Sequence, residues 1–301
     1  MPDRFRVVLI AVALLALGLA VRRALPPSGA KARTLSFGGL DRSYVLYAAN
    51  TPKKSGLVLV LHGLHGTGVE VERRTNRTFD ALADREGFVV VYPDAEGVRW
   101  SEGWPRTDGP PGRGDEIDDV GFLSALIDSV CKELDIDPRR VYATGLSDGA
   151  SMVYRLACER DDKVAAIAPV AGSIADPVAM RCKDGRPIPL LVIHGTSDAV
   201  VPYDMAVPKN LAQWVQRDGC PIAPEITYLP DVDENDGTRT RLEHRRPCKD
   251  DAEISLYVIE GGGHRWPGDD TLKPFANLGR YSRDFDAASV IWDFFKRHTL
   301  P

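Results

Sequence analysis

The most informative segment of this 301-residue chain reads VYATGLSDGA and covers residues 141–150. Its first part, Val141 to Thr144, is rich in β-branched and aromatic residues and predicts a buried strand, whereas Ser147 to Glu159 has the apolar spacing of a helix. A Gly-x-Ser-x-Gly motif between a strand and a helix is typical of a nucleophile elbow, because the glycines permit the strained turn that lifts the serine hydroxyl clear of the sheet. The alternative is that Ser147 only caps its helix.

Short apolar runs alternate with longer amphipathic stretches over most of the chain. The expected strands are 44–47, 57–61, 88–92, 141–144, 165–170, 190–193 and 256–259. The expected helices are 78–86, 118–134, 147–159, 204–217 and 285–298. Because parallel strands need a crossover connection, this order predicts an α/β fold with a mainly parallel sheet covered by helices on both faces. Residues 96–115 and 227–254 interrupt the alternation, and we expect a long loop in the first and a surface hairpin in the second.

A catalytic serine needs two partners, and this chain contains candidates for both. The hydroxyl needs a neighbouring base, and the base needs a carboxylate that orients it. Asp198 directly follows the expected strand 190–193, and His264 follows the expected strand 256–259, in the order Ser, Asp, His that α/β-hydrolases use. We therefore expect Ser147 as nucleophile, His264 as base and Asp198 as the orienting acid. Taken singly, Asp198 also fits a turn-forming residue and His264 a structural loop histidine.

Backbone amides near Ser147 are candidates for an oxyanion hole, the donors that stabilise negative charge during acyl transfer. The amide of Asp148 follows the nucleophile at a helix start, and the turn after strand 57–61 offers the amide of Leu64 as the second donor. His62, His65 and His264 raise the alternative of a metal site, which we do not favour because no Asp or Glu stands at ligand spacing. We expect neither a metal nor an organic cofactor.

The net charge of the chain argues against a nucleic-acid partner. The formal net charge is −5, which offers no basic field for a nucleic-acid backbone, so nucleic acid is not an expected partner.

The amino-terminal segment has the pattern of an export signal. Arg4 and Arg6 precede a 15-residue apolar run, Val7 to Val21. Arg22 and Arg23 follow at once, so an uncleaved membrane anchor is the alternative, although spanning a bilayer takes about 20 apolar residues.

We expect a single folded domain after this amino-terminal segment. We expect residues 1–25 to be a signal peptide or anchor, residues 26–33 a linker and residues 34–301 a single hydrolase domain. The expected location is the periplasm or the cell exterior, with a membrane tether only if the amino-terminal segment stays attached. The expected state is a monomer that binds a small or oligomeric substrate.

The five cysteines are an odd number, so one of them must remain unpaired. In an oxidising compartment an even subset pairs, and Cys158 with Cys182 and Cys220 with Cys248 are sequence neighbours that would close loops of moderate size. Cys131 lies in the helical segment and fits a small buried residue. We expect these two disulfides, and the alternative is five reduced thiols in a cytosolic protein.

Short motifs along the chain are specific when they are taken together. They are LHG at 61–63, ADREGF at 83–88, YPD at 92–94, DDVGF at 118–122, GLSDG at 145–149, IHGTSD at 193–198 and GGGHRWP at 261–267. Over most of residues 40–297 the chain resembles the secreted esterases that are polyhydroxybutyrate depolymerase-like and related to feruloyl esterases, within the α/β-hydrolase fold. The resemblance implies the same catalytic roles for Ser147, Asp198 and His264, with the amides of Leu64 and Asp148 as oxyanion donors.

The chain departs from that family where substrate recognition is expected. The family usually has Gly at the positions of Leu64 and His65, Asn at the position of Asp148, and a Trp-Asn-Asp-Gly-like loop where this chain has WSEGW at 100–104. We expect Trp100, Trp104 and Trp266 to contact the acyl group, because an indole on a loop beside a catalytic histidine can lie flat on an apolar or ring-bearing group. The alternative for each is plain packing.

The expected function is hydrolysis of carboxylic esters through an acyl-serine intermediate. Oligomers or polyesters of hydroxyalkanoates such as 3-hydroxybutyrate are the first expectation for the substrate, and feruloyl or acetyl esters on xylan-type plant polysaccharides are the alternative. A catalytically inactive binding module at the cell surface is the rival from another class. The complete set of Ser, Asp and His argues against that rival.

Overall fold

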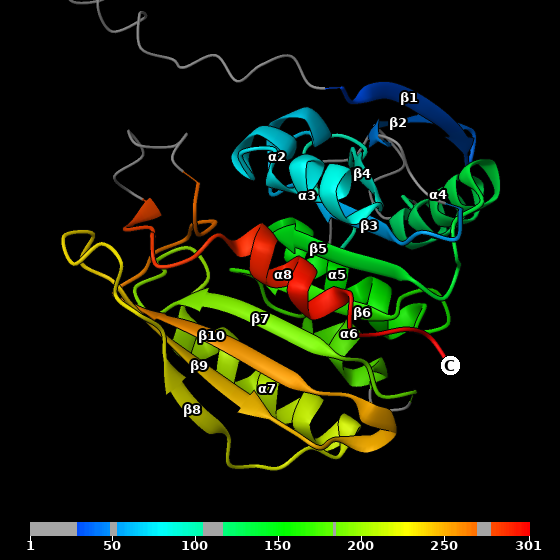
Figure 1. Ribbon diagram of the computed structural model, residues 1–301. Coiled ribbons are helices and arrows are strands. Elements are labelled where there is room, and N and C mark those ends of the chain that lie inside the picture. Colours follow the sequence, from blue (N-terminus) through cyan, green and yellow to red (C-terminus); the bar gives the residue numbers. More distant parts are fainter. Residues whose placement is uncertain (1–28, 49–52, 105–116, 183–184, 270–277) are drawn as a thin grey trace, which may run out of the picture.

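The computed structural model describes residues 29–48, 53–104, 117–182, 185–269 and 278–301 (Figure 1). Within these ranges the strands form one 10-stranded sheet in the order β1-β2-β4-β3-β5-β6-β7-β10-β9-β8. The strands are β1 (Lys31–Phe37), β2 (Leu40–Tyr47), β3 (Leu57–Leu61), β4 (Val89–Pro93), β5 (Val141–Leu146), β6 (Ala166–Val170), β7 (Leu190–Gly195), β8 (Glu225–Tyr228), β9 (Arg239–Arg245) and β10 (Ile254–Glu260). The α-helices are α2 (Gly68–Arg74), α3 (Thr78–Glu86), α4 (Asp119–Leu134), α5 (Asp148–Glu159), α6 (Asp176–Arg181), α7 (Tyr203–Asp218) and α8 (Ala287–Phe295).

The centre of the sheet is parallel, which confirms the predicted α/β fold. Strands β4, β3, β5, β6, β7 and β10 pair in parallel, and the strands outside them pair in antiparallel. The chain runs from β3 outward to β4 and then crosses back over β3 to β5. The connections that leave β3 and β5 therefore go to opposite sides, and such a switch point at the carboxyl edge is where α/β proteins place their sites.

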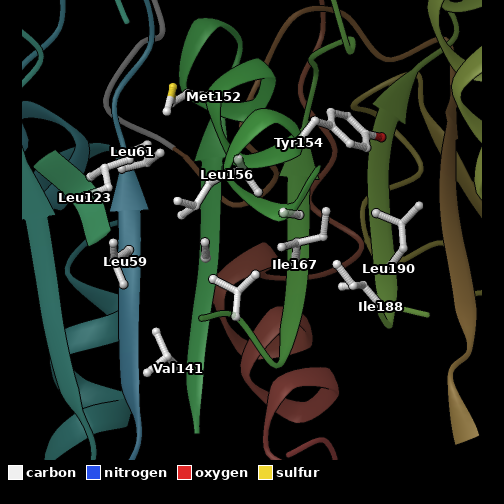
Figure 2. Packing of buried hydrophobic residues seen from close by; sticks show 14 of the residues in the cluster. Leu59, Leu61, Leu123, Val141, Met152, Tyr154, Leu156, Ile167, Ile188 and Leu190 are labelled. Atoms are coloured by element: carbon white, nitrogen blue, oxygen red, sulfur yellow. The ribbon is translucent and has the colours of Figure 1, made fainter. Parts of the chain in front are cut away.

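Helices cover both faces of the sheet, and each face has its own core. Leu57, Leu59 and Leu61 of β3 point into the first core and Val58 and Val60 into the second, as the two-residue period of a strand requires. Helices α4, α5, α6 and α7 pack on the first face, part of which Figure 2 shows, and α2, α3 and α8 pack on the second. A strand buried on both faces must be apolar throughout, which is why its sequence reads as a continuous apolar run.

The sheet extends further than the sequence predicts. Strand β1 begins at Lys31, inside the segment 26–33 that was expected to be a linker, so that boundary is wrong. The hairpin of β8 and β9 forms, but it is not a surface excursion, because β9 pairs with β10 and adds both strands to the sheet edge. Helices α2 and α6 were not predicted, because with 7 and 6 residues they show too little of a helical period.

Part of the predicted organisation lies outside the described residues. The expected signal peptide or anchor, 1–25, and most of the expected loop 96–115 fall in ranges that the structure does not describe. No helix within the described ranges is long and apolar enough to cross a bilayer. The expected signal peptide or anchor therefore stays a prediction.

Two disulfides join the cysteines in the predicted pairs, Cys158–Cys182 and Cys220–Cys248. Cys131, on α4, is half-buried and free. Since Cys158 lies near the end of α5 and Cys182 directly follows α6, the first bond fastens these two helices to each other.

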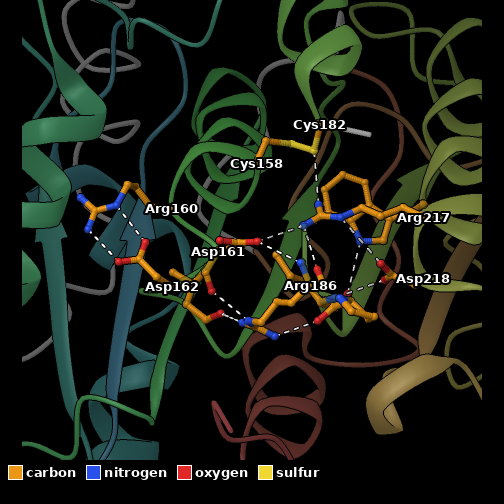
Figure 3. Close-up of polar contacts among 12 residues, drawn as sticks. Cys158, Arg160, Asp161, Asp162, Cys182, Arg186, Arg217 and Asp218 are labelled. Carbon is orange, nitrogen blue, oxygen red and sulfur yellow. Dashed lines mark hydrogen bonds and ion pairs between the residues drawn. A yellow bond between two sulfur atoms is a disulfide. The ribbon is translucent and has the colours of Figure 1, made fainter. Parts of the chain in front are cut away.

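A buried arginine continues this connection to α7 (Figure 3). Arg217 of α7 lies with its Nη1 3.3 Å from the Sγ of Cys182 and its Nη2 3.9 Å from the Asp161 carboxylate. The same Nη2 donates to the carbonyl of Arg186 at 2.9 Å. The ends of α5, α6 and α7 are therefore held by one cluster of covalent and polar contacts.

Replacing Cys158 and Cys182 together by serine is expected to lower the free energy of unfolding by about 3 kcal/mol, because the bond closes a loop between cysteines 24 residues apart. Urea unfolding followed by circular dichroism measures this loss. Cys131→Ser is the matched control and is expected to change stability by less than about 1 kcal/mol, because that thiol is free. Equal losses in the two variants would contradict a stabilising cross-link.

Candidate active site

Ser147 stands on a strained turn between β5 and α5. Its backbone has φ 58° and ψ −117°, a region that non-glycine residues avoid, and its amide donates to the Val170 carbonyl at 2.9 Å. Side chains at the flanking glycines would not fit. A Cβ added at Gly145 would lie 2.7 Å from the Gly149 carbonyl carbon, and one at Gly149 would overlap the Leu61 carbonyl oxygen. The Ser147 hydroxyl makes no capping hydrogen bond, so its interpretation as a simple helix cap is wrong.

Asp198 and His264 meet because β7 and β10 are neighbours in the sheet. The loops beyond the two strands are joined by a hydrogen bond from the Ser197 amide to the Gly262 carbonyl, 2.8 Å long. This brings the His264 Nδ1 to 2.8 Å from the Asp198 Oδ2, and both side chains are buried. The two residues that the sequence pairs by role are thus hydrogen-bonded in the fold.

The Asp198 carboxylate has donors at both of its oxygens. Oδ1 accepts the amides of Val200 and Val201 at 2.8 Å each, and Oδ2 lies 3.3 Å from the His194 Nε2 in addition to its bond with His264. Burial by itself raises the pKa of this carboxyl. The hydrogen bonds from His194 and His264, the charge of His264 and the Val201 amide outweigh burial and hold the pKa well below its usual range. Asp198 therefore stays ionised at neutral and mildly acidic pH.

Ser147 and His264 lie at the same edge of the sheet, beyond the carboxyl ends of β5 and β10. Over the described ranges there is no hydrogen bond between the Ser147 hydroxyl and the His264 imidazole. Hydrogen bonds between catalytic groups often shorten only when substrate binds. The catalytic roles assigned to Ser147, Asp198 and His264 stay predictions.

The turn His62-Gly63-Leu64, which follows β3, lies directly against Ser147. A Cβ added at Gly63 would meet the Cβ of Ser147 at 3.4 Å, and a bond of 3.0 Å from the Gly66 amide to the Gly63 carbonyl closes the turn. The Leu64 amide donates no hydrogen bond within the part of the chain that the structure describes. This position beside Ser147 is compatible with the predicted role of Leu64 as an oxyanion donor.

The His62 imidazole fixes this turn from inside the protein. Its Nδ1 lies 2.8 Å from the Gly63 carbonyl oxygen, and its Nε2 accepts the Ala95 amide at 3.0 Å, so Nδ1 carries the hydrogen and donates it. Burial lowers the pKa of His62, against the opposing effect of the Gly63 carbonyl and nearby carboxylates. The ring must be neutral here, because a protonated Nε2 could not accept the Ala95 amide. Both ring nitrogens therefore hold backbone groups in place.

Two carboxylates fasten the loop 99–102 to the site. The Asp148 Oδ2 accepts the Trp100 amide at 2.7 Å, and the Asp119 Oδ2 accepts the Ser101 amide at 2.7 Å. Asp119 also pairs with Arg42 at 2.6 Å. Sequence reasoning missed this role of the Asp148 side chain, because its partner is brought near by packing and not by sequence spacing.

The tryptophans that were expected to contact the substrate have different surroundings. Trp100 has no exposed surface; its Nε1 donates to the His62 carbonyl at 2.9 Å, and its ring centre lies 5.1 Å from that of the imidazole. Trp266 is 2% exposed and packs edge-on against Phe79. The prediction that these two indoles contact substrate is therefore wrong, since both are packed inside the protein. Trp104 is 45% exposed, and its role stays a prediction.

The sequence is similar to one protein family and to several named esterases. Residues 42–179 match the family described as esterase PHB depolymerase. Over 91% of this chain the sequence is 31% identical to NocK of Nocardia uniformis subsp. tsuyamanensis, which is named as an esterase and of which 84% is covered. It is also 28% identical, over 83% of its length, to feruloyl esterase B of Piromyces equi. The chain spans only 43% of that second relative.

Comparison with solved structures bears on the fold. An acetyl xylan esterase from Aspergillus awamori superimposes with a TM-score of 0.60 and covers 78% of this chain and 94% of its own. The sequence identity is 16%, so this likeness shows a shared fold alone. It agrees with the α/β architecture built up from the strand pairing.

Replacing Asp148 by alanine leaves the buried Trp100 amide without this acceptor and is expected to lower the free energy of unfolding by about 1–3 kcal/mol. Asp148→Asn is the matched control, because its amide oxygen can still accept that bond. The asparagine variant loses the 3.8 Å ion pair with Arg99, which is partly exposed and contributes little. Urea unfolding measures the free energy of unfolding, and the rate of backbone hydrogen exchange in residues 99–102 measures how firmly the loop is held. A loss as large in the asparagine variant as in the alanine variant would contradict this role.

Proposed function

Because this chain belongs to the PHB depolymerase-like and feruloyl esterase-like family of α/β-hydrolases, and is therefore a carboxylic ester hydrolase, we propose that Ser147, His264 and Asp198 form its catalytic triad. The observation that supports this most directly is the 2.8 Å hydrogen bond between Asp198 and His264. It lies at the sheet edge to which the strained turn of Ser147 also belongs. The low pKa of Asp198 agrees with a carboxylate that must stay ionised beside an imidazolium.

The proposed reaction begins with acylation of Ser147. The His264 Nε2 takes the hydroxyl proton while the Ser147 oxygen attacks the ester carbonyl carbon, and Asp198 orients the ring through Nδ1. The amides of Leu64 and Asp148 donate to the oxyanion that forms. The imidazolium then gives its proton to the departing alcohol, which leaves an acyl-serine. The same imidazole then takes a proton from a water molecule, which attacks the acyl carbon, and gives that proton to the Ser147 oxygen as the acid leaves.

The proposed substrates are oligomers or polyesters of hydroxyalkanoates, with 3-hydroxybutyrate esters first. The support is the family that matches residues 42–179, whose description is a PHB depolymerase. Feruloyl or acetyl esters on xylan-type polysaccharides are the second candidate, because a relative that matches 83% of this chain is named a feruloyl esterase. The exposed indole of Trp104 is the proposed contact for the acyl group in either case.

The proposed setting is outside the cytoplasm, with the protein acting as a monomer. Two disulfides support export, because such bonds persist in oxidising compartments. The apolar run from Val7 to Val21 behind Arg4 and Arg6 would supply the signal, or a membrane tether if it is not cleaved.

A fluorophosphonate probe is expected to add its mass to Ser147 of the purified protein, because labelling needs an assembled base and oxyanion hole. Ser147→Ala is expected to remain unlabelled and to lose ester hydrolysis by a factor of about 1000 or more. Ser151→Ala, one turn further along α5, is the matched control and is expected to keep both label and activity. A folded protein that takes up no probe would favour the inactive binding module.

Acid release from a 3-hydroxybutyrate oligomer is expected to exceed release from methyl ferulate under identical conditions, with Ser147→Ala as the blank. Trp104→Ala is expected to raise KM for the oligomer about threefold to tenfold, because it removes one aromatic contact from the acyl group. Preference for methyl ferulate would move the protein to polysaccharide de-esterification. An unchanged KM in a folded Trp104→Ala variant would remove this indole from the binding site.

A further inference from the structure

A second histidine contacts the carboxylate that binds His264. His194 lies on β7, its side chain is fully buried, and its Nε2 is 2.8 Å from the Val201 carbonyl oxygen and 3.3 Å from the Asp198 Oδ2. The Asp198 Oδ2 therefore has two imidazole nitrogens beside it, the Nε2 of His194 and the Nδ1 of His264. His194 takes no part in the proposed reaction described above.

The surroundings of His194 define which of its nitrogens carries a hydrogen. Nε2 faces a carbonyl oxygen and an ionised carboxylate, both of which can only accept, so Nε2 must be the donor. Nδ1 is buried and has no hydrogen-bond partner in the ranges that the structure describes. A second hydrogen there would be buried without an acceptor, at a cost in free energy. The geometry thus selects the neutral ring with hydrogen on Nε2.

We propose that His194 is a positioning residue for the triad, which donates to Asp198 and so fixes the carboxylate that orients His264. This inference rests on the proposed roles of Asp198 and His264. The donated bond also shares the negative charge of one carboxylate oxygen between two imidazoles. Asp198 then stabilises the His264 imidazolium less than an unshared carboxylate would, and the imidazolium gives its proton more readily to the leaving alcohol.

The loop after β7 supplies most of the support for this carboxylate. Two of its amides, one of them that of Val201, donate to Asp198. The Nε2 of His194, near the end of β7, lies 3.3 Å from the same carboxylate and 2.8 Å from the Val201 carbonyl oxygen, to which it donates. The ring of Tyr203, at the start of α7, packs edge-on against His194 with 5.9 Å between ring centres. Among the described residues, the titratable groups that contact His194 or its carboxylate partner are Asp198 on the loop after β7, Tyr203 on α7 and, across the carboxylate, His264 beyond β10.

A matched pair of substitutions at position 194 tests this role. His194→Gln keeps an N–H donor at a similar reach, whereas His194→Met fills a similar volume with a flexible apolar side chain and removes the donor. His194→Met is expected to lower kcat about tenfold at unchanged KM, because the carboxylate loses a fixed donor away from the substrate. The acid limb of the kcat/KM profile is expected to move to higher pH by about half a unit, because the unshared carboxylate holds the imidazolium more tightly. His194→Gln is expected to restore most of kcat and the wild-type limb.

Urea unfolding and circular dichroism separate this role from stability alone. Equal loss of stability in both variants, with the wild-type kcat and acid limb, would show His194 to be a packing residue and overturn the inference. If His194→Met does not fold, His194→Asn replaces it, because its shorter amide does not reach Asp198 and the same changes are expected. Ser147→Ala is the blank that separates the two proposals. If Ser147→Ala still hydrolyses the ester, the triad itself is overturned. If Ser147→Ala is inactive while the His194 variants keep the wild-type kcat and acid limb, only the role of His194 is overturned.

Discussion

The close approach of helix α5 to strand β3 is the constraint on which the site depends. At Gly149 the helix backbone lies so near the carbonyl oxygens of Leu61 and His62 that it leaves no room for a side chain. The same approach sets Ser147 against Gly63. The proposed nucleophile and the proposed oxyanion donors therefore stand at the ends of regular elements whose separation is fixed, and such elements hold reacting groups in place more accurately than long loops do.

Buried hydrogen bonds connect these elements to the loops around them. His62, after β3, binds the backbone beyond β4 through its ring and accepts the indole hydrogen of Trp100 at its carbonyl. The carboxylate of Asp148, the first residue of α5, accepts the backbone amide of Trp100. Because such bonds are strong in a low-dielectric interior and costly to leave unmade, a satisfied network of this kind favours one arrangement of the loops. The indole of Trp100 thus belongs to the scaffold of the site.

The features that could be predicted from the sequence are those with a local signal. The run Leu57–Leu61 is apolar at every position, and a Gly-x-Ser-x-Gly motif is recognisable wherever it follows a strand. Strand β1 could not be predicted, because Lys31–Phe37 is largely polar and becomes a strand through its pairing with β2. The indoles of Trp100 and Trp266 could not be placed either, because a loop tryptophan faces inward or outward according to partners far along the chain. The contact between His194 and Asp198 could not be predicted for a related reason, because it depends on how the loop after β7 folds back toward the strand.

The exposed strand β8 limits the growth of the sheet at one of its two edges. An edge strand presents unpaired backbone donors and acceptors to which a strand of another molecule can add, and such addition is a first step toward fibrils. Strand β8 has only 4 residues, and Pro224 and Pro230 stand on either side of it. Because proline has no N–H to donate, a strand added at this edge could form few backbone hydrogen bonds beyond those four residues. Addition of a further strand is therefore disfavoured at this edge, although the sheet is not closed.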